Sequence, residues 1–270
     1  MIMIRKPIVS GQFYNDDAKE LKKEIKKYMD TVKPEKKAAA AISPHAGYYF
    51  SGQCAAYSYK SVKDSDAELF IVLGLSHSGY ESCVSLDDFE TPLGIVKNDN
   101  EFAKLLIKNG LKEDKKAHNC EHSIEVQLPF LQYVKENLKF VPVIVSEDYE
   151  NVAKIIIKTI KESGRKVIII ASSDFTHYGY NYGFIPFSDN IKENMYKLDK
   201  GAIDKIINND LKGFLDYTER TGATICGKYP IACLMKILNK KGKLLKYYTS
   251  GDIINDYSSA VGYAAIVFNL

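Results

Sequence analysis

Three histidines of the chain each follow a short apolar segment. His45 comes after AAAAISP, His77 after LFIVLGLS and His177 after VIIIASSDFT. Continuous apolar runs that end in turn residues are typical of strands buried on both faces of a parallel sheet. The carboxyl ends of such strands meet at one edge, where α/β proteins bind their ligands. One strand-end histidine is usually structural, but three at one edge indicate a functional site.

Two further side chains fit the same edge. Asp174 precedes His177 by three residues and can orient its ring or serve as a ligand itself. Cys226 lies in the loop GATICGKYP, ahead of an apolar helix, where a helix N-terminus would favour a thiolate. The alternative for Cys226 is a small buried apolar residue, which is what we expect of Cys233.

The segment CEHSIEVQLPF contributes a fourth histidine. On a helix, His122 and Glu125 would share a face one turn apart, which suits metal ligation or a proton relay. The alternative is an acidic helix N-terminus that complements the helix dipole. His118, Cys120 and His122 also look like ligands, but no second cluster accompanies them, which argues against a zinc site there.

The elements that must position these residues alternate between strands and helices. Further strands are predicted at Lys139–Val145 and Ala260–Phe268. Asp16 and Asp17 can cap one helix and Asp99 another. Apolar residues recur at helical intervals in four segments, namely Ala18–Met29, Phe102–Lys108, Ile124–Lys135 and Val152–Lys161. From Asp189 to Lys241 the pattern is mostly helical, interrupted by a loop at Thr221–Pro230.

Length and composition place these elements in one domain. The 270 residues show no linker or repeat, so we expect a single α/β domain over residues 1–270, with three αβα layers around a mostly parallel sheet. The net charge of +3 gives no support for nucleic acid as a partner. No apolar run approaches the ~20 residues of a membrane span. Five cysteines without a CxxC pair predict a reduced, cytoplasmic protein.

The motifs PHAGYYFSG, GLSHSG, EHSIEVQLPFL, SSDFTHYG and TICGKYP, in this order, resemble the Memo family. The resemblance runs from about Gly11 to the C-terminus. It implies a fold similar to the class III extradiol dioxygenases, which hold a non-heme iron with two histidines and a carboxylate. Carried over by motif, it implies His45, His77 and Cys226 as metal ligands. Asp174 and His177 would lie beside them as catalytic residues, with His122 as a further candidate.

The resemblance also limits which chemistry we expect. Cys226 stands where the dioxygenases have a glutamate, and a thiolate is softer and more easily oxidised than a carboxylate. We therefore expect Fe(II) or copper, with zinc as the alternative, and redox or oxygen-dependent chemistry without assuming ring cleavage. In prokaryotes the family recurs with a radical-SAM protein and a third partner, which suggests a shared pathway.

Two other functions use the same residues. A non-catalytic protein could hold a peptide or a partner's loop, or a small organic molecule, in a cleft lined by some of the nineteen tyrosines. Alternatively, a hydrolase could use Cys226 as nucleophile and His177 as base, provided that the two lie within hydrogen-bond reach.

Overall fold

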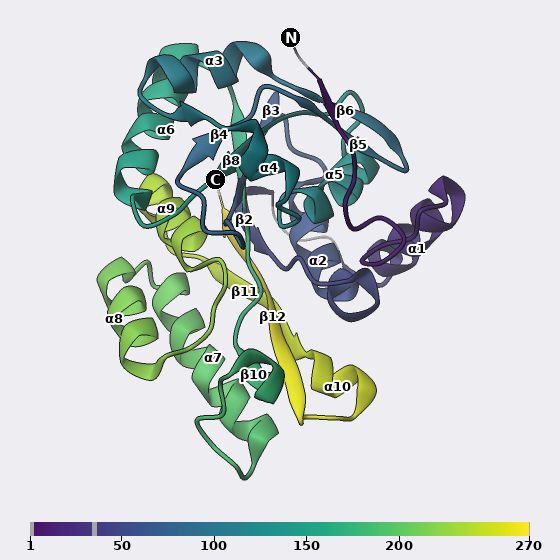
Figure 1. Ribbon diagram of the computed structural model, residues 1–270, viewed down its shortest axis with the longest axis vertical. Helices are drawn as coiled ribbons and strands as arrows, with labels where there is room; N and C mark the ends of the chain where they lie inside the picture. Colours follow the sequence, from purple (N-terminus) through teal and green to yellow (C-terminus); the bar gives the residue numbers. More distant parts are fainter. Residues whose placement is uncertain (1–2, 34–36, 270) are drawn as a thin grey trace.

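The computed structural model describes residues 3–33 and 37–269. Its sheet is mixed and mostly parallel, in the order β1-β5-β6-β8-β3-β9-β2-β12-β10, with β11 paired to β12 and β4 paired to β7 and β8 (Figure 1). The strands are β1 (Ile4–Arg5), β2 (Ala38–Ser43), β3 (Leu69–Gly74), β4 (Cys83–Val84), β5 (Asp88–Thr91), β6 (Gly94–Asn98), β7 (Lys112–Glu113), β8 (Lys139–Ile144), β9 (Val167–Ser172), β10 (His177–Gly179), β11 (Lys243–Thr249) and β12 (Ser259–Asn269).

The middle of the sheet is parallel. Strands β8, β3, β9 and β2 are neighbours that run in the same direction. Their apolar residues are buried on both faces, as the continuous apolar runs predict. This confirms the α/β fold. It also places the carboxyl ends of β3, β9 and β2 next to one another at one edge.

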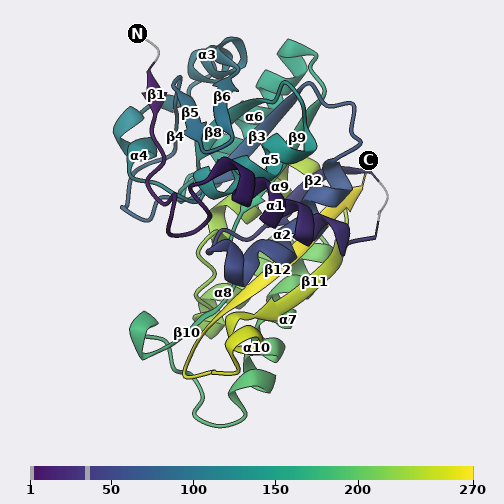
Figure 2. The same ribbon diagram turned by 90° about the vertical axis from the view of Figure 1, so that its right-hand side faces the viewer.

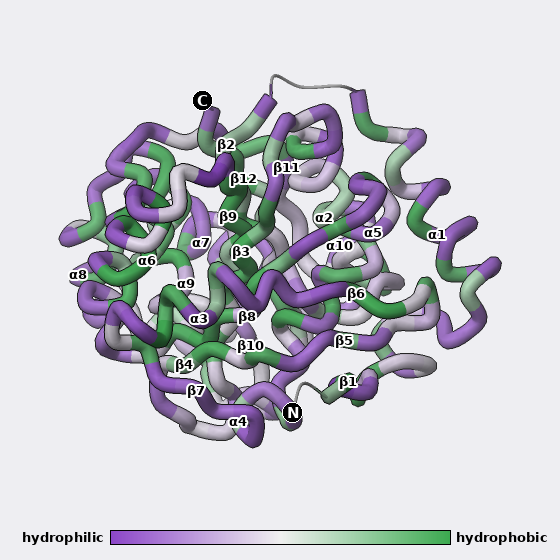
Figure 3. The backbone as a smooth tube through the Cα atoms, turned by 90° about the horizontal axis from the view of Figure 1, so that it is seen from above, coloured by the Kyte–Doolittle hydropathy of each residue, from purple (hydrophilic) through white to green (hydrophobic). Residues whose placement is uncertain are grey.

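Helices cover both faces of the sheet (Figures 2 and 3). One face packs against α1, α2 and α5, and the other against α3, α6, α7, α8 and α9. The helices are α1 (Ala18–Asp30), α2 (Tyr48–Val62), α3 (Asn100–Lys108), α4 (Lys115–Asn119), α5 (Leu128–Val134), α6 (Tyr149–Ser163), α7 (Ile191–Ile207), α8 (Leu211–Thr221), α9 (Lys228–Leu238) and α10 (Ser250–Ile254), with 3-10 turns η1 (Glu125–Gln127) and η2 (Tyr180–Tyr182).

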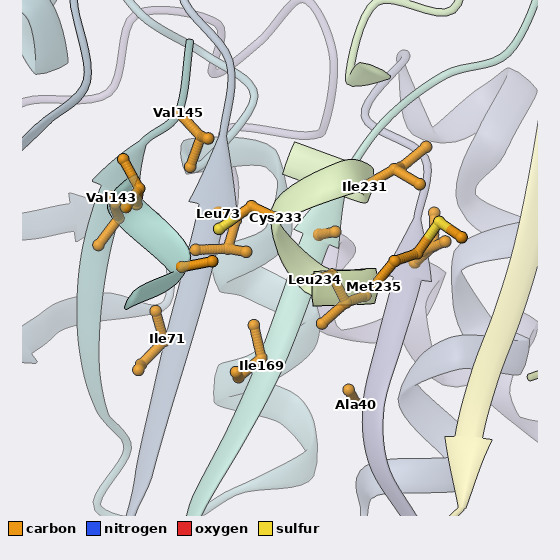
Figure 4. Packing of buried hydrophobic residues seen from close by; sticks show 14 of the residues in the cluster. Ala40, Ile71, Leu73, Val143, Val145, Ile169, Ile231, Cys233, Leu234 and Met235 are labelled. Carbon is orange, nitrogen blue, oxygen red and sulfur yellow. The ribbon is translucent and has the colours of Figure 1, made fainter. Parts of the chain in front are cut away.

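Helix α9 lies directly on the parallel strands. Figure 4 shows Ile231, Leu234 and Met235 of α9 in one cluster with apolar side chains of the strands beneath them. Cys233 belongs to the same cluster and is fully buried, which confirms the sequence interpretation of this residue as a small apolar one. Because α9 is fixed in this way, the loop before it, which carries Cys226, is held over the ends of the strands.

The predicted helices form with small changes of boundary. The side chain of Asp17 caps α1 and that of Asp99 caps α3, as expected. The helix predicted at Ile124–Lys135 is shorter, because its first turn is the 3-10 turn Glu125–Gln127 and α-helix begins only at Leu128.

Two features of the sheet are not predicted by the sequence. The hairpin of β5 and β6 is short, and β11 has no regular alternation of apolar and polar residues. Both are stabilised by pairing with neighbouring strands, which a local pattern does not reveal. In the described part of the chain, no helix is both long enough and apolar enough to cross a bilayer.

A carboxyl group of α7 is buried against the end of β12. Asp199 is fully buried and accepts hydrogen bonds from the amide and hydroxyl of Thr176 and from the hydroxyl of Tyr247. Burial raises its pKa to about 6, and these donors only partly oppose that effect. The folded state therefore keeps a proton that the unfolded chain releases near pH 4.

This difference predicts a pH dependence of stability. The contribution of Asp199 is complete below about pH 4 and is lost as the pH rises through about 6, because the folded state then has to hold a buried charge. The loss amounts to about 3 kcal/mol for a pKa difference of about 2. Urea unfolding between pH 4 and pH 7 should show that Asp199→Asn loses less stability than the wild type. Equal pH slopes in both proteins would contradict the raised pKa.

Candidate metal centre

The predicted site residues come together at the carboxyl edge of the parallel strands. His45 follows β2, His77 follows β3, and Asp174 follows β9 between them. His122 joins them from the segment between α4 and η1. Within the described residues, one group of three side chains could hold a metal ion, because ligand atoms of His45, His77 and His122 all lie within 4.8 Å of one another.

The hydrogen bonds of Ser172 determine the tautomer of His45. The Ser172 hydroxyl donates to the carbonyl of Ser123 (2.7 Å) and accepts from the side-chain amide of Gln127 (2.7 Å). Its one hydrogen is thus in use, so at 2.9 Å from His45 Nδ1 it can only accept. His45 therefore carries its proton on Nδ1. Its Nε2 is then unprotonated and has a lone pair that can bind a metal.

The carboxylate of Glu121 determines the tautomer of His77. Glu121 accepts from His77 Nδ1 (2.9 Å) and from the backbone amides of His77 and Ser123 (both 2.7 Å). Burial raises the pKa of Glu121, but the hydrogen bonds from His77 and from the amides outweigh it, and the pKa falls to about 2. The ionised carboxylate holds the proton of His77 on Nδ1. Carboxylates orient metal-binding histidines in this manner.

The third imidazole lies flat against the second. The rings of His77 and His122 are stacked with centroids 4.4 Å apart, and the edge of Phe13 contacts His122 at 5.1 Å. Burial, followed by the neighbouring histidine charges, lowers the pKa of both His45 and His122. Both imidazoles are therefore neutral near pH 7. Neutral imidazole is the form that binds metals.

Cys226 lies next to this group. Its Sγ is 3.3 Å from Nε2 of His45, the nitrogen that the hydrogen bond of Ser172 leaves free. The sulfur also accepts from the backbone amide of Asp174 (3.3 Å). Burial raises the pKa of the thiol, so in the absence of a metal it is protonated. Its role as a ligand, which the family resemblance implies, remains a prediction.

Asp174 and His177 lie at the same edge but are not arranged as expected. Asp174 is buried and accepts the backbone amide of His45 (2.8 Å), and burial raises its pKa. The sequence interpretation has Asp174 orient the ring of His177. Instead, His177 Nδ1 donates to the carbonyl of Thr224 (3.0 Å), which leaves its Nε2 free for proton exchange.

Glu125 and His118 are not part of the group of histidines that could hold a metal. Glu125 is fully buried and turns to the N-terminal segment, where it pairs with Arg5, so the shared helix face predicted for His122 and Glu125 does not form. His118 is buried, with no hydrogen bond to either ring nitrogen among the described residues, and burial lowers its pKa to about 4. Cys120 is exposed. His118 and Cys120 are outside the group of three ligands found among the described residues.

Sequence patterns do not predict which residues orient the imidazoles. The local sequence pattern does not identify Glu121, Ser172, Gln127 or Thr224 as partners of the histidines. One signal was present, since Ser172 directly follows the apolar run of β9, as a residue at the strand-end edge must. The other three are brought to the histidines by tertiary packing alone.

The histidines open onto a cavity of about 430 Å³. Tyr49, Tyr182 and Tyr263 contribute to its wall, so the expected tyrosine lining is present in part. Tyr48 and Tyr80, which follow His45 and His77 in the sequence, are not part of this wall. Tyr48 is buried, and its hydroxyl donates to the carbonyl of Val126. The titratable residues on the cavity wall are His45, His77, His122, Asp174 and His177, together with the three tyrosines.

The chain is similar to known proteins over nearly its whole length. A family model described as "Memo-like protein" matches residues 5–267. A MEMO1 family protein of Archaeoglobus fulgidus is 39% identical over 99% of this chain and 100% of its own length. Relatives in Methanosarcina mazei and Methanopyrus kandleri are 37% and 38% identical, each over 98% of this chain and over 98% and 99% of their own lengths.

Proposed function

The chain belongs to the Memo-like protein family, and on this premise we propose that it is a non-heme metal protein that binds Fe(II) or copper. The ligands in this proposal are His45, His77 and His122, with Cys226 as a further ligand. One observation carries it: three imidazoles converge, and two of them donate hydrogen bonds from Nδ1 to other protein groups, so that their Nε2 atoms are unprotonated. Imidazole suits iron, copper and zinc, and a sulfur ligand favours copper.

A bound metal of this kind would supply activation of oxygen or of a reducible organic molecule. The chain itself would hold that molecule in the tyrosine-lined cavity beside the imidazoles. His177 donates a hydrogen bond from Nδ1 to the carbonyl of Thr224, so it would accept or donate a proton at Nε2. Asp174 would fix the backbone of His45 through its amide.

The test is metal content. Full-length protein purified under anaerobic conditions and loaded separately with Fe(II), copper or zinc should bind about one metal per chain. His45→Ala/Cys226→Ser should bind little, while His118→Gln, which changes a buried histidine outside the group, should bind as the wild type does. Equal metal content in the wild type and the double variant would refute the proposal.

Glu121 should matter for metal affinity without touching the metal. In Glu121→Gln, the side-chain amide would face one of the donors that the carboxylate now accepts from, so the orientation of His77 is weakened. We expect a 10–100-fold loss of metal affinity, measured by competition with a chelator. Glu81→Gln, which changes an exposed carboxylate, is the matched control. Wild-type affinity in Glu121→Gln would show that the carboxylate does not support the centre.

A second candidate function is binding of a peptide or a partner protein in the same cavity. The observation in its favour is an exposed apolar rim: Tyr49, Tyr182 and Ile254 line the cavity and are 67%, 44% and 46% exposed. Exposed aromatic residues gathered at one opening are typical of binding surfaces. Affinity capture with Tyr49→Ser/Tyr182→Ser should then lose partners that the wild type and a Tyr80→Ser control retain. Identical recovery of partners by all three proteins would exclude the rim as the binding surface.

The hydrolase hypothesis is not supported in the same way. The imidazole within hydrogen-bond distance of the Cys226 sulfur is that of His45, whereas His177 bonds to Thr224. Burial also raises the pKa of the thiol, which opposes formation of a thiolate nucleophile.

A further inference from the structure

A second cavity lies on the other side of Cys226. It has a volume of about 710 Å³ and is bounded by the segments that follow β3 and β8 and by the first turns of α6 and α9. Cys226 lines this cavity, whereas His45 lines the histidine cavity. Because Cys226 Sγ and His45 Nε2 are 3.3 Å apart, these two side chains form part of the wall between the two cavities.

A reagent in the second cavity can reach the sulfur of Cys226 if the exposed part of this residue faces that cavity. Cys226 is partly exposed, unlike Cys54, Cys83 and Cys233, which are buried. Cys226 does not line the histidine cavity. Its exposed surface therefore faces the second cavity.

The lining of the second cavity is acidic. Glu147 accepts a hydrogen bond from the hydroxyl of Tyr229 (3.3 Å), and Asp148 accepts from the hydroxyls of Ser82 and Ser146. All of these donors are neutral, and among the described residues neither carboxylate forms an ion pair.

The one lysine of this lining, Lys112, offsets only part of this negative charge, although Glu81 and, more weakly, Asp148 act on it and raise its pKa. Lys112 forms an ion pair with Glu81, another residue of the lining. Two negative charges therefore remain. Tyr80 adds an aromatic ring whose face can attract a cation, whereas the ring of Tyr229 already holds the ammonium of Lys228, 4.7 Å from its centroid.

We propose that Cys226 is reached through the second cavity, and that this cavity admits a positively charged group, a primary amine or a guanidinium, to the thiol. The proposal deepens the proposed function, since the centre would then be open to one molecule on the histidine side and to a cationic group on the thiol side. It concerns access to the sulfur and can be tested without any metal.

The first test measures the rate at which Cys226 is labelled by a methanethiosulfonate reagent. Full-length, chelator-treated Cys120→Ser protein is the background, because Cys120 is exposed and would react as well. Asn151→Trp places a large side chain in the second cavity, and Lys154→Trp is its control on the same helix outside the cavity. Gln12→Trp obstructs the histidine cavity instead.

Asn151→Trp should slow labelling at least about tenfold, while Gln12→Trp and Lys154→Trp should leave the rate near that of the background, since reaction requires access to the sulfur. Labelling that is slowed by Gln12→Trp and not by Asn151→Trp would overturn the proposal, and so would equal slowing by both. Asn151 and Gln12 are exposed, and circular dichroism checks that the variants are folded.

The second test measures charge preference. The ethylammonium reagent should react faster than the ethylsulfonate reagent, and the ratio of the two rates should fall toward 1 in Glu147→Gln/Asp148→Asn. The ratio is informative because any change in the thiol pKa alters both rates alike. A ratio that is unchanged in the double variant would overturn the cationic specificity. Neither test measures bound metal, so a failure here is distinct from a failure of the metal site.

Discussion

Replacement of His122 by alanine is expected to weaken metal binding more than 100-fold, as much as His45→Ala or His77→Ala. The reason is geometric, because ligand atoms of all three imidazoles lie within 4.8 Å of one another. Loss of a residue that merely orients a ligand costs 10–100-fold in affinity, so loss of a ligand itself should cost more. Dissociation constants for Fe(II) and copper, measured by competition with chelators, check this result.

The variant also distinguishes two versions of the centre. The family resemblance implies His45, His77 and Cys226 as ligands, whereas the geometry groups His122 with the first two histidines. If His122→Ala binds metal as the wild type does while Cys226→Ser does not, the thiolate is the third ligand and our expectation for His122 is wrong. His118→Gln again serves as the control.

The second large effect concerns stability. Arg5 and Glu125 form an ion pair whose side chains are only 2% and 0% exposed. Arg5 also donates to the carbonyls of His118 (3.0 Å) and Glu121 (2.7 Å), while Glu125 accepts from the Tyr14 hydroxyl (2.6 Å). The network thus attaches the N-terminal segment to the backbone that carries His122.

Arg5→Met or Glu125→Gln should lower the free energy of unfolding by about 3–5 kcal/mol, because each leaves one buried charge without its partner. Urea unfolding of the metal-free protein measures this value without a contribution from metal release.

The matched control is the exposed pair of Lys6 and Glu90, where Lys6→Met or Glu90→Gln should change stability by less than about 1 kcal/mol. A loss below about 1 kcal/mol in Arg5→Met would show that the buried network is dispensable. Since Arg5 holds the carbonyl of Glu121, its loss should also weaken metal binding, although less than loss of a ligand.

Some residues of the site can be predicted from the local sequence pattern around them, and others cannot. His45, His77 and Asp174 follow apolar strands, and the edge of a parallel sheet brings such residues together whatever the details of packing. His122 follows no strand. Its helical spacing to Glu125 predicts a shared helix face. Glu125 instead begins a 3-10 turn and forms an ion pair with the buried Arg5.

Local sequence is sufficient to predict the family, the α/β fold and the strand-end histidines, because apolar runs and ordered motifs do not depend on how the rest of the chain packs. Tertiary structure alone decided which imidazoles meet, which nitrogen of each is free, and that Cys226 separates two cavities. These features depend on contacts such as those of Ser172 with Ser123 and of Cys226 with His45, which join residues 49 and 181 positions apart. Only the packing of helices on both faces of the sheet brings such distant residues together.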